Sequence, residues 1–126
     1  MGGERDLSRL LQGLKPRLYP ERYAFAAVVE PSFRAHQFAI VREGEGLTSI
    51  HPDSQGEWAR ISLEIHSSLD AVGLTGAMAS RLADLGISVN IIAALHHDHL
   101  FVPWDRREEA LECLQSLQRE AEERPV

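Results

Sequence analysis

The sequence predicts an α+β fold, an antiparallel sheet with helices on one face. Two observations lead to this prediction: apolar and polar residues alternate in several short runs, and leucines recur at helical spacing between those runs. In the second half of the chain, the order is strand, helix, strand, strand and helix. This order is most of one ferredoxin-like β-α-β-β-α-β unit. The elements expected there occupy residues 61–65, 74–85, 88–95, 99–103 and 105–120.

The first half of the chain predicts one short helix and three strands. Four leucines between positions 7 and 14 mark an amphipathic helix that Pro16 ends. Residues 23–29 have the composition of a strand, and two further strand runs, 37–42 and 47–51, flank a glycine-containing hairpin loop. The stretch 51–56 has the least regular pattern, so we divide the chain into halves, 1–56 and 57–126.

The second half begins with alternation of Ile61, Leu63 and Ile65 with polar residues, which is typical of a half-buried strand. The helix that follows is expected to end at Gly86 in a left-handed turn. The last helix is expected to begin at Asp105, with Glu108 three residues on as in a capping box.

Composition excludes several classes of function. The chain has 126 residues, a hydrophobic fraction of 44% and a net charge of −6, which is ordinary for a globular domain but not for a nucleic-acid surface. No apolar run approaches the roughly 18 residues of a membrane-spanning helix. A lone cysteine, Cys113, excludes an internal disulfide, and we expect a cytoplasmic protein with no nucleic-acid or membrane partner.

The two glycines at the start of the helix expected at residues 74–85 are not explained by helix formation alone. Gly73 and Gly76 each cost about 1 kcal/mol relative to alanine in a helix. The helix does not need them to begin, because Ser67, Ser68 and Asp70 are N-cap candidates. Glycine there lets another group approach the backbone, and a helix start favours a carboxylate or phosphate. Equally, the glycines would clear room for a packed strand or a neighbouring subunit.

A histidine cluster, His96-His97-Asp98-His99, has the residue types of a metal site, and His66 could add a further imidazole. On a strand, however, His97 and His99 share one face while Asp98 points to the other. We therefore predict no metal and no other cofactor. A small metal-assisted or acid–base enzyme that uses these side chains stays an alternative.

Two motifs in register, Val72-Gly-Leu-Thr-Gly76 and Asp98-His-Leu-Phe-Val-Pro103, resemble those of ACT domains. More narrowly, the chain resembles small bacterial tandem-ACT proteins, which are related to the ACT modules of aspartate kinases and of cytosolic arginine sensors. The resemblance covers nearly the whole chain and implies two ACT-like halves, 1–56 and 57–126. The similar segments are residues 11–16, 42–48, 61–76, 82–92 and 97–103.

The resemblance implies a stand-alone regulatory or sensor module, without catalysis, that binds a small molecule, expected to be an amino acid. It also implies a homodimer, because ACT domains usually bind their ligand between two units. Backbone and hydroxyl groups of the helix turn would meet the ligand carboxylate, and Asp98 would face its ammonium. The implied ligand-binding residues are Ser68, Val72, Gly73, Leu74, Thr75, Asn90, Ile91, Ile92, His97 and Asp98.

A third interpretation is a module that regulates a partner enzyme by contact and binds no small molecule. A thermal-shift screen against amino acids separates it from ligand binding.

Overall fold

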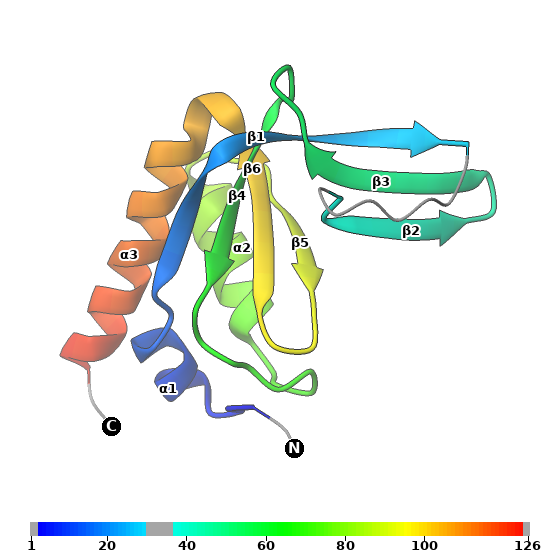
Figure 1. Ribbon diagram of the computed structural model, residues 1–126. Coiled ribbons are helices and arrows are strands. Elements are labelled where there is room, and N and C mark those ends of the chain that lie inside the picture. The colour runs from blue at the N-terminus through cyan, green and yellow to red at the C-terminus, as the bar shows by residue number, and fades with distance from the viewer. Residues whose placement is uncertain (1–2, 30–36, 125–126) are drawn as a thin grey trace.

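The computed structural model describes residues 3–29 and 37–124, which form a six-stranded sheet with three α-helices on one face (Figure 1). Every pairing in the sheet is antiparallel, and the strand order is β2-β3-β1-β4-β6-β5. The α+β, ferredoxin-like prediction is therefore confirmed. The elements are α1 (Leu7–Gln12), β1 (Pro16–Val28), β2 (Ala39–Glu43), β3 (Gly46–Pro52), β4 (Trp58–Leu63), α2 (Leu74–Asp84), β5 (Asn90–Ala93), β6 (Asp98–Pro103), the 3-10 turn η1 (Trp104–Arg106) and α3 (Arg107–Glu123).

Strand β1 joins the two ends of the sheet. Its first part pairs with β4, where Leu18 lies opposite Ile61, and its second part pairs with β3. Beside β4, β1 takes the place that the last strand of a β-α-β-β-α-β unit would occupy. The sheet thus crosses the division at residues 56 and 57, and that division into domains stays a prediction.

The expected start of this strand at residue 23 was wrong, because β1 begins at Pro16. Prolines are disfavoured inside strands, and two of them, Pro16 and Pro20, lie in this part. The strand accommodates Pro20 because the register with β4 shifts between Leu18 and Arg22, so this exposed residue lies where the pairing is irregular.

The helices cover one face of the sheet and build the main core with it. α2 and α3 bury apolar side chains against β4 and β6, and α1 packs against both helices, with Leu10 fully buried in the same core. Cys113, on α3, lies in this core. The largest fully buried side chains of this core are Leu10, Leu14, Ile61, Leu63, Met78, Leu82, Leu100, Val102 and Leu114.

Other predicted boundaries were also wrong, and β4 covers residues 58–63 rather than the expected 61–65. Asp105 falls inside the 3-10 turn, so α3 begins two residues later, with Arg106 at the N-cap and no side-chain cap. The expected Asp105–Glu108 capping box is therefore absent. Strand β5 covers only residues 90–93 of the expected 88–95.

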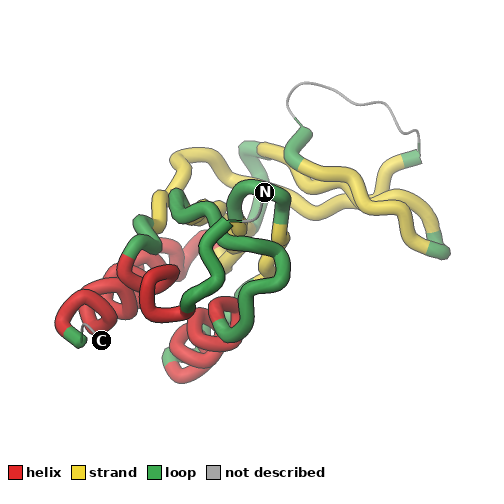
Figure 2. Tube along the Cα trace, turned by 90° about the horizontal axis from the view of Figure 1, so that it is seen from below, coloured by secondary structure: helices red, strands yellow, loops and turns green. Residues whose placement is uncertain are grey.

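A smaller aromatic core lies on the face of the sheet that carries no helices. There the distal part of β1 forms a three-stranded arm with β2 and β3, which projects from the helix-covered part (Figures 1 and 2). Its rings meet edge to face, for example Tyr23 and Phe101 with centroids 5.5 Å apart. The residues of this core are Tyr23, Phe38, Ala39, Ile50, Trp58, Ile92 and Phe101.

In the part of the chain that the structure describes, no helix has both the length and the apolar character needed to cross a membrane.

Candidate functional site

A cleft lies where α2 begins, between the loop that follows β4 and the adjoining ends of β5 and β6. We call it the α2 cleft. Its volume is about 430 Å³, including the space open to solvent. The residues that line it are Ser67, Ser68, Leu69, Ala71, Gly73, Leu74, Thr75, Ala93 and Asp98.

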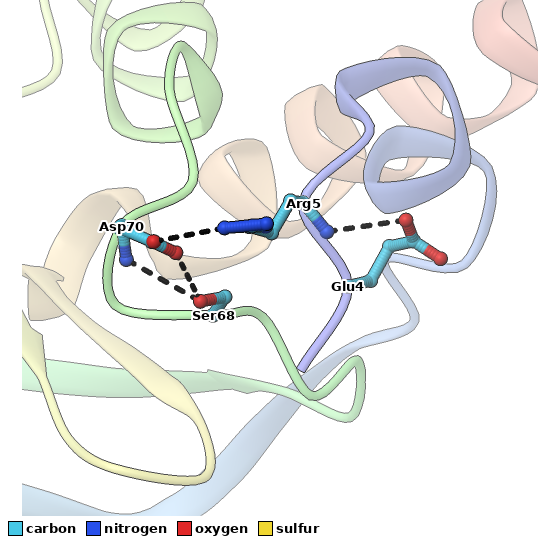
Figure 3. A network of polar contacts seen from close by, with 4 residues as sticks. All are labelled: Glu4, Arg5, Ser68 and Asp70. Atoms are coloured by element: carbon cyan, nitrogen blue, oxygen red, sulfur yellow. Dashed lines mark hydrogen bonds and ion pairs between the residues drawn. The ribbon is translucent and has the colours of Figure 1, made fainter. Parts of the chain in front are cut away.

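The loop that forms one wall of the cleft is attached to the N-terminal segment. The backbone of Glu4 pairs with this loop, donating to the His66 carbonyl and accepting from the Ser68 N–H, both at 2.9 Å. Arg5 extends this attachment, since its guanidinium lies 3.0 Å from the Asp70 carboxylate, which also accepts from the Ser68 hydroxyl (Figure 3). The Ser68 hydrogen bond, followed by Arg5, lowers the pKa of Asp70.

Helix α2 begins without a side-chain cap. Its N-cap is Gly73, with φ +102° and ψ −18°, and none of the three candidates Ser67, Ser68 and Asp70 caps it. The left-handed conformation explains the glycine at 73, because other residues rarely adopt this φ. A Cβ there would also meet Leu7 Cδ2 at 3.1 Å. The sequence interpretation that Gly73 sits inside the helix was therefore wrong.

The absence of a side-chain cap matters for the cleft. The first N–H groups of a helix have no acceptor inside the helix, and the helix dipole places partial positive charge there. Leu74 and Thr75, the first two residues of α2, both border the cleft. Its wall therefore favours an anion.

The opposite charge comes from Asp98, the first residue of β6. This side chain is only 8% exposed, and Oδ2 accepts a hydrogen bond of 2.9 Å from the Ser67 hydroxyl. Among the described residues nothing donates to Oδ1, yet no fully buried side-chain polar atom lacks a partner. Oδ1 is therefore accessible, and the carboxylate is available to a donor in the cleft.

The structure brings together five of the ten predicted ligand-binding residues at this cleft: Ser68, Gly73, Leu74, Thr75 and Asp98. Val72, 83% exposed, does not line it. Of the three β5 residues, Ile91 packs in the helix-side core, Ile92 belongs to the aromatic core on the other face, and Asn90 is exposed. Their neighbour Ala93 borders the cleft instead.

Sequence reasoning missed four lining residues: Ser67, Leu69, Ala71 and Ala93. Ala93 was missed because the resemblance implied the earlier β5 residues Asn90, Ile91 and Ile92, whereas it is the last residue of the strand that borders the cleft. The signal was present in the alternation, since Ile91 and Ala93 share a face of the strand.

His97 lies in a different pocket, on the helix-free face, together with His99. The predicted alternation around Asp98 is thus confirmed, because Asp98 lines the α2 cleft on the other face. The rings of His66 and His96 lie 5.5 Å apart, but within residues 3–29 and 37–124 no three metal-ligating side chains are grouped to share an ion. The cluster therefore gives no support to the metal-assisted form of the enzyme alternative.

Two family models, both described as ACT domain, match the chain: one over residues 53–116 and the other over residues 2–68. Both matches include β4. A search of curated proteins found no match.

Two solved structures share the fold. A Vibrio cholerae protein of unknown function, VC0802, described as a possible transport protein, is 35% identical, with a TM-score of 0.72 over 89% of this chain and 95% of that one. The Agobacterium tumefaciens protein Atu0741 is 16% identical, with a TM-score of 0.63 over 83% of this chain and 89% of that one, and it supports the fold alone. With two ACT-domain models matched and a 35% identical relative aligned over most of both chains, this chain belongs to the ACT domain family.

Proposed function

We propose that this protein is a regulatory module that binds a free amino acid in the α2 cleft. ACT domains are typically regulatory modules that bind small molecules. The observation that carries the proposal is that the uncapped start of α2 and the buried carboxylate of Asp98 border one cleft. An α-amino acid carries a carboxylate for the helix start and an ammonium for Asp98. Chemistry on the ligand is not part of the proposal.

A thermal-shift screen against the twenty amino acids tests this function. We expect one amino acid, or a few related ones, to raise the melting temperature, since a ligand at 100 times its Kd adds about 2.7 kcal/mol. Matched controls are the N-acetyl derivative, which lacks the ammonium, and the amide, which lacks the carboxylate. Both should lose most of the shift. If no amino acid raises the melting temperature, or if both derivatives act as well as the parent, the proposal is wrong.

We also propose that two copies pair across the mouth of this cleft. Leu69, Val72 and Leu95 are 66%, 83% and 64% exposed, and they lie in the cleft loop and in the turn between β5 and β6. Strand β5 is an edge of the sheet, and an unpaired strand edge readily accepts another strand. A two-fold dimer would cover both the apolar side chains and the edge.

Light scattering on the purified protein should then give twice the chain mass of 14.1 kDa. Val72→Asp should give the monomer mass, because the charge would be buried at the interface. Val41→Asp is the matched control, since Val41 is exposed on the opposite edge strand β2. A monomeric wild type, or a dimer that only Val41→Asp dissociates, would contradict this arrangement.

A further inference from the structure

The helix-free face of the sheet carries a second pocket, which the proposed amino-acid site does not use. We call it the open-face pocket; its volume is about 530 Å³, including open space. Register places its polar residues side by side, because Arg17 of β1 lies opposite Ser62 of β4, which lies opposite His99 of β6. Arg60 shares the face with Ser62, and His97 lies at the rim.

The pocket gathers positive charge in a protein whose net charge is −6. Two arginines, Arg17 and Arg60, line it together with His97 and His99, against a single acidic residue, Glu64, which is exposed. The guanidinium groups therefore outnumber the carboxylates in this pocket.

Arg60 is the centre of this arrangement. Its Nε donates to Ser62 Oγ at 2.9 Å and its Nη1 to the Tyr23 hydroxyl at 3.0 Å. The guanidinium also lies 3.9 Å from the ring centroid of Tyr19 and 4.6 Å from that of Phe38. These contacts fix the orientation of the side chain, which is half-buried.

Among the described residues, no carboxylate is paired with this cation. Within the described residues Arg60 forms no ion pair, and its Nη2 group donates to no protein acceptor. Removing a cation from water without a counter-charge is costly. Because two contacts and two rings hold the guanidinium in place, its free edge is preorganised for an acceptor.

His99 supplies a second donor through Ser62. Ser62 Oγ, which accepts from Arg60, lies 2.7 Å from His99 Nδ1 and forms a hydrogen bond with it. In the tautomer in which Nδ1 accepts from this hydroxyl, the neutral imidazole carries its proton on Nε2. Burial, then the charges of Arg60 and His97, lowers the pKa of His99 to about 4, so this ring is neutral at pH 7.

We propose that the open-face pocket binds a small oxyanion, a phosphate or carboxylate group, which Arg60, Arg17 and His99 hold. Arg60 offers its Nη2 edge, Arg17 adds an exposed cation, and the ring of His99 offers Nε2–H. This site is separate from the α2 cleft, because Asp98 and His99 are successive residues of β6 and face opposite sides of the sheet.

Nuclear magnetic resonance at constant ionic strength tests the proposal with inorganic phosphate and acetate as probes. We expect saturable shifts of the Arg60 Nε–H and His99 ring signals with at least one probe, and the tighter one identifies the anion class. The bound anion should also raise the pKa of His99 by about one unit, because it offsets Arg60 and His97; Arg17, Glu64, Tyr19 and Tyr23 also face this region.

Two variants and a control make the test specific. Arg60→Gln should weaken binding at least tenfold, and Arg17→Gln, at an exposed position on β1, should weaken it about threefold. Arg107→Gln is the control, because Arg107 is likewise stacked, 3.8 Å from the Trp104 ring centroid, but lies outside the pocket. The proposal is overturned if chloride produces the same shifts, if neither probe saturates, or if Arg17→Gln and Arg107→Gln bind equally.

Discussion

Replacement of Gly56 by alanine is expected to lower the free energy of unfolding by about 3 kcal/mol or more. Gly56 is buried just before β4, and a Cβ there would lie 2.3 Å from the carbonyl oxygen of Tyr23 and 2.5 Å from its carbonyl carbon. Both contacts are with backbone, so no side-chain rotation relieves them. Relief requires β1 to move at Tyr23, which pairs with both β3 and β4.

The movement of β1 would also disturb the hydrogen bonds between β1 and the segment that contains Gly56. Arg22 Nη1 donates to the Gly56 carbonyl at 2.9 Å, and the Arg22 carbonyl accepts from the Asp53 N–H at the same distance. The substitution should therefore destabilise the whole sheet, because β1 is the strand that joins the arm to the helix-covered part.

Urea unfolding followed by circular dichroism measures this effect. The matched control is Gly44→Ala, since a Cβ at Gly44 meets nothing within 4 Å and its φ is not in the left-handed region. Its unfolding free energy should stay within about 0.5 kcal/mol of wild type. If Gly56→Ala unfolds at the same urea concentration as Gly44→Ala, the close contact between Gly56 and the Tyr23 backbone is not present in solution.

Local patterns predicted those elements whose periodicity is complete. Alternation located β4 and leucine spacing located α2 and α3, because each buries one regular face against the same core. The first part of β1 was missed because the prolines at 16 and 20 argue against a strand, and the compensating shift in register is a property of the pairing with β4. Such pairing joins residues that are distant in sequence, so a local pattern does not contain it.

The candidate site was predictable to a similar extent. Resemblance to a family located Gly73, Thr75 and Asp98, but not the reason for the glycine, because its φ depends on how the whole loop approaches α2. The backbone pairing of Glu4 with the loop joins residues more than sixty positions apart, so no local pattern predicts it. The open-face pocket depends on the register of β1, β4 and β6, so Arg60 carried no signal in the sequence.

Asp98→Asn is expected to reduce the affinity for the amino acid found in the screen by about 10- to 100-fold, since hydrogen bonds to charged groups contribute about 1.5–3 kcal/mol. Asparagine has nearly the same shape, and its amide oxygen can still accept from the Ser67 hydroxyl. The substitution therefore removes the charge that would face the ammonium while the start of β6 keeps its hydrogen bond.

Calorimetric titration of the variant and urea unfolding of its ligand-free form separate binding from folding. Asp84→Asn is the matched control, because it removes the same charge at an exposed position in the last turn of α2, outside the cleft. It should bind like wild type. Since Asp98 is the one carboxylate that lines the α2 cleft in the described structure, unchanged affinity in Asp98→Asn would mean that the ligand ammonium lies elsewhere. Lost stability with normal binding would make Asp98 a structural partner of Ser67.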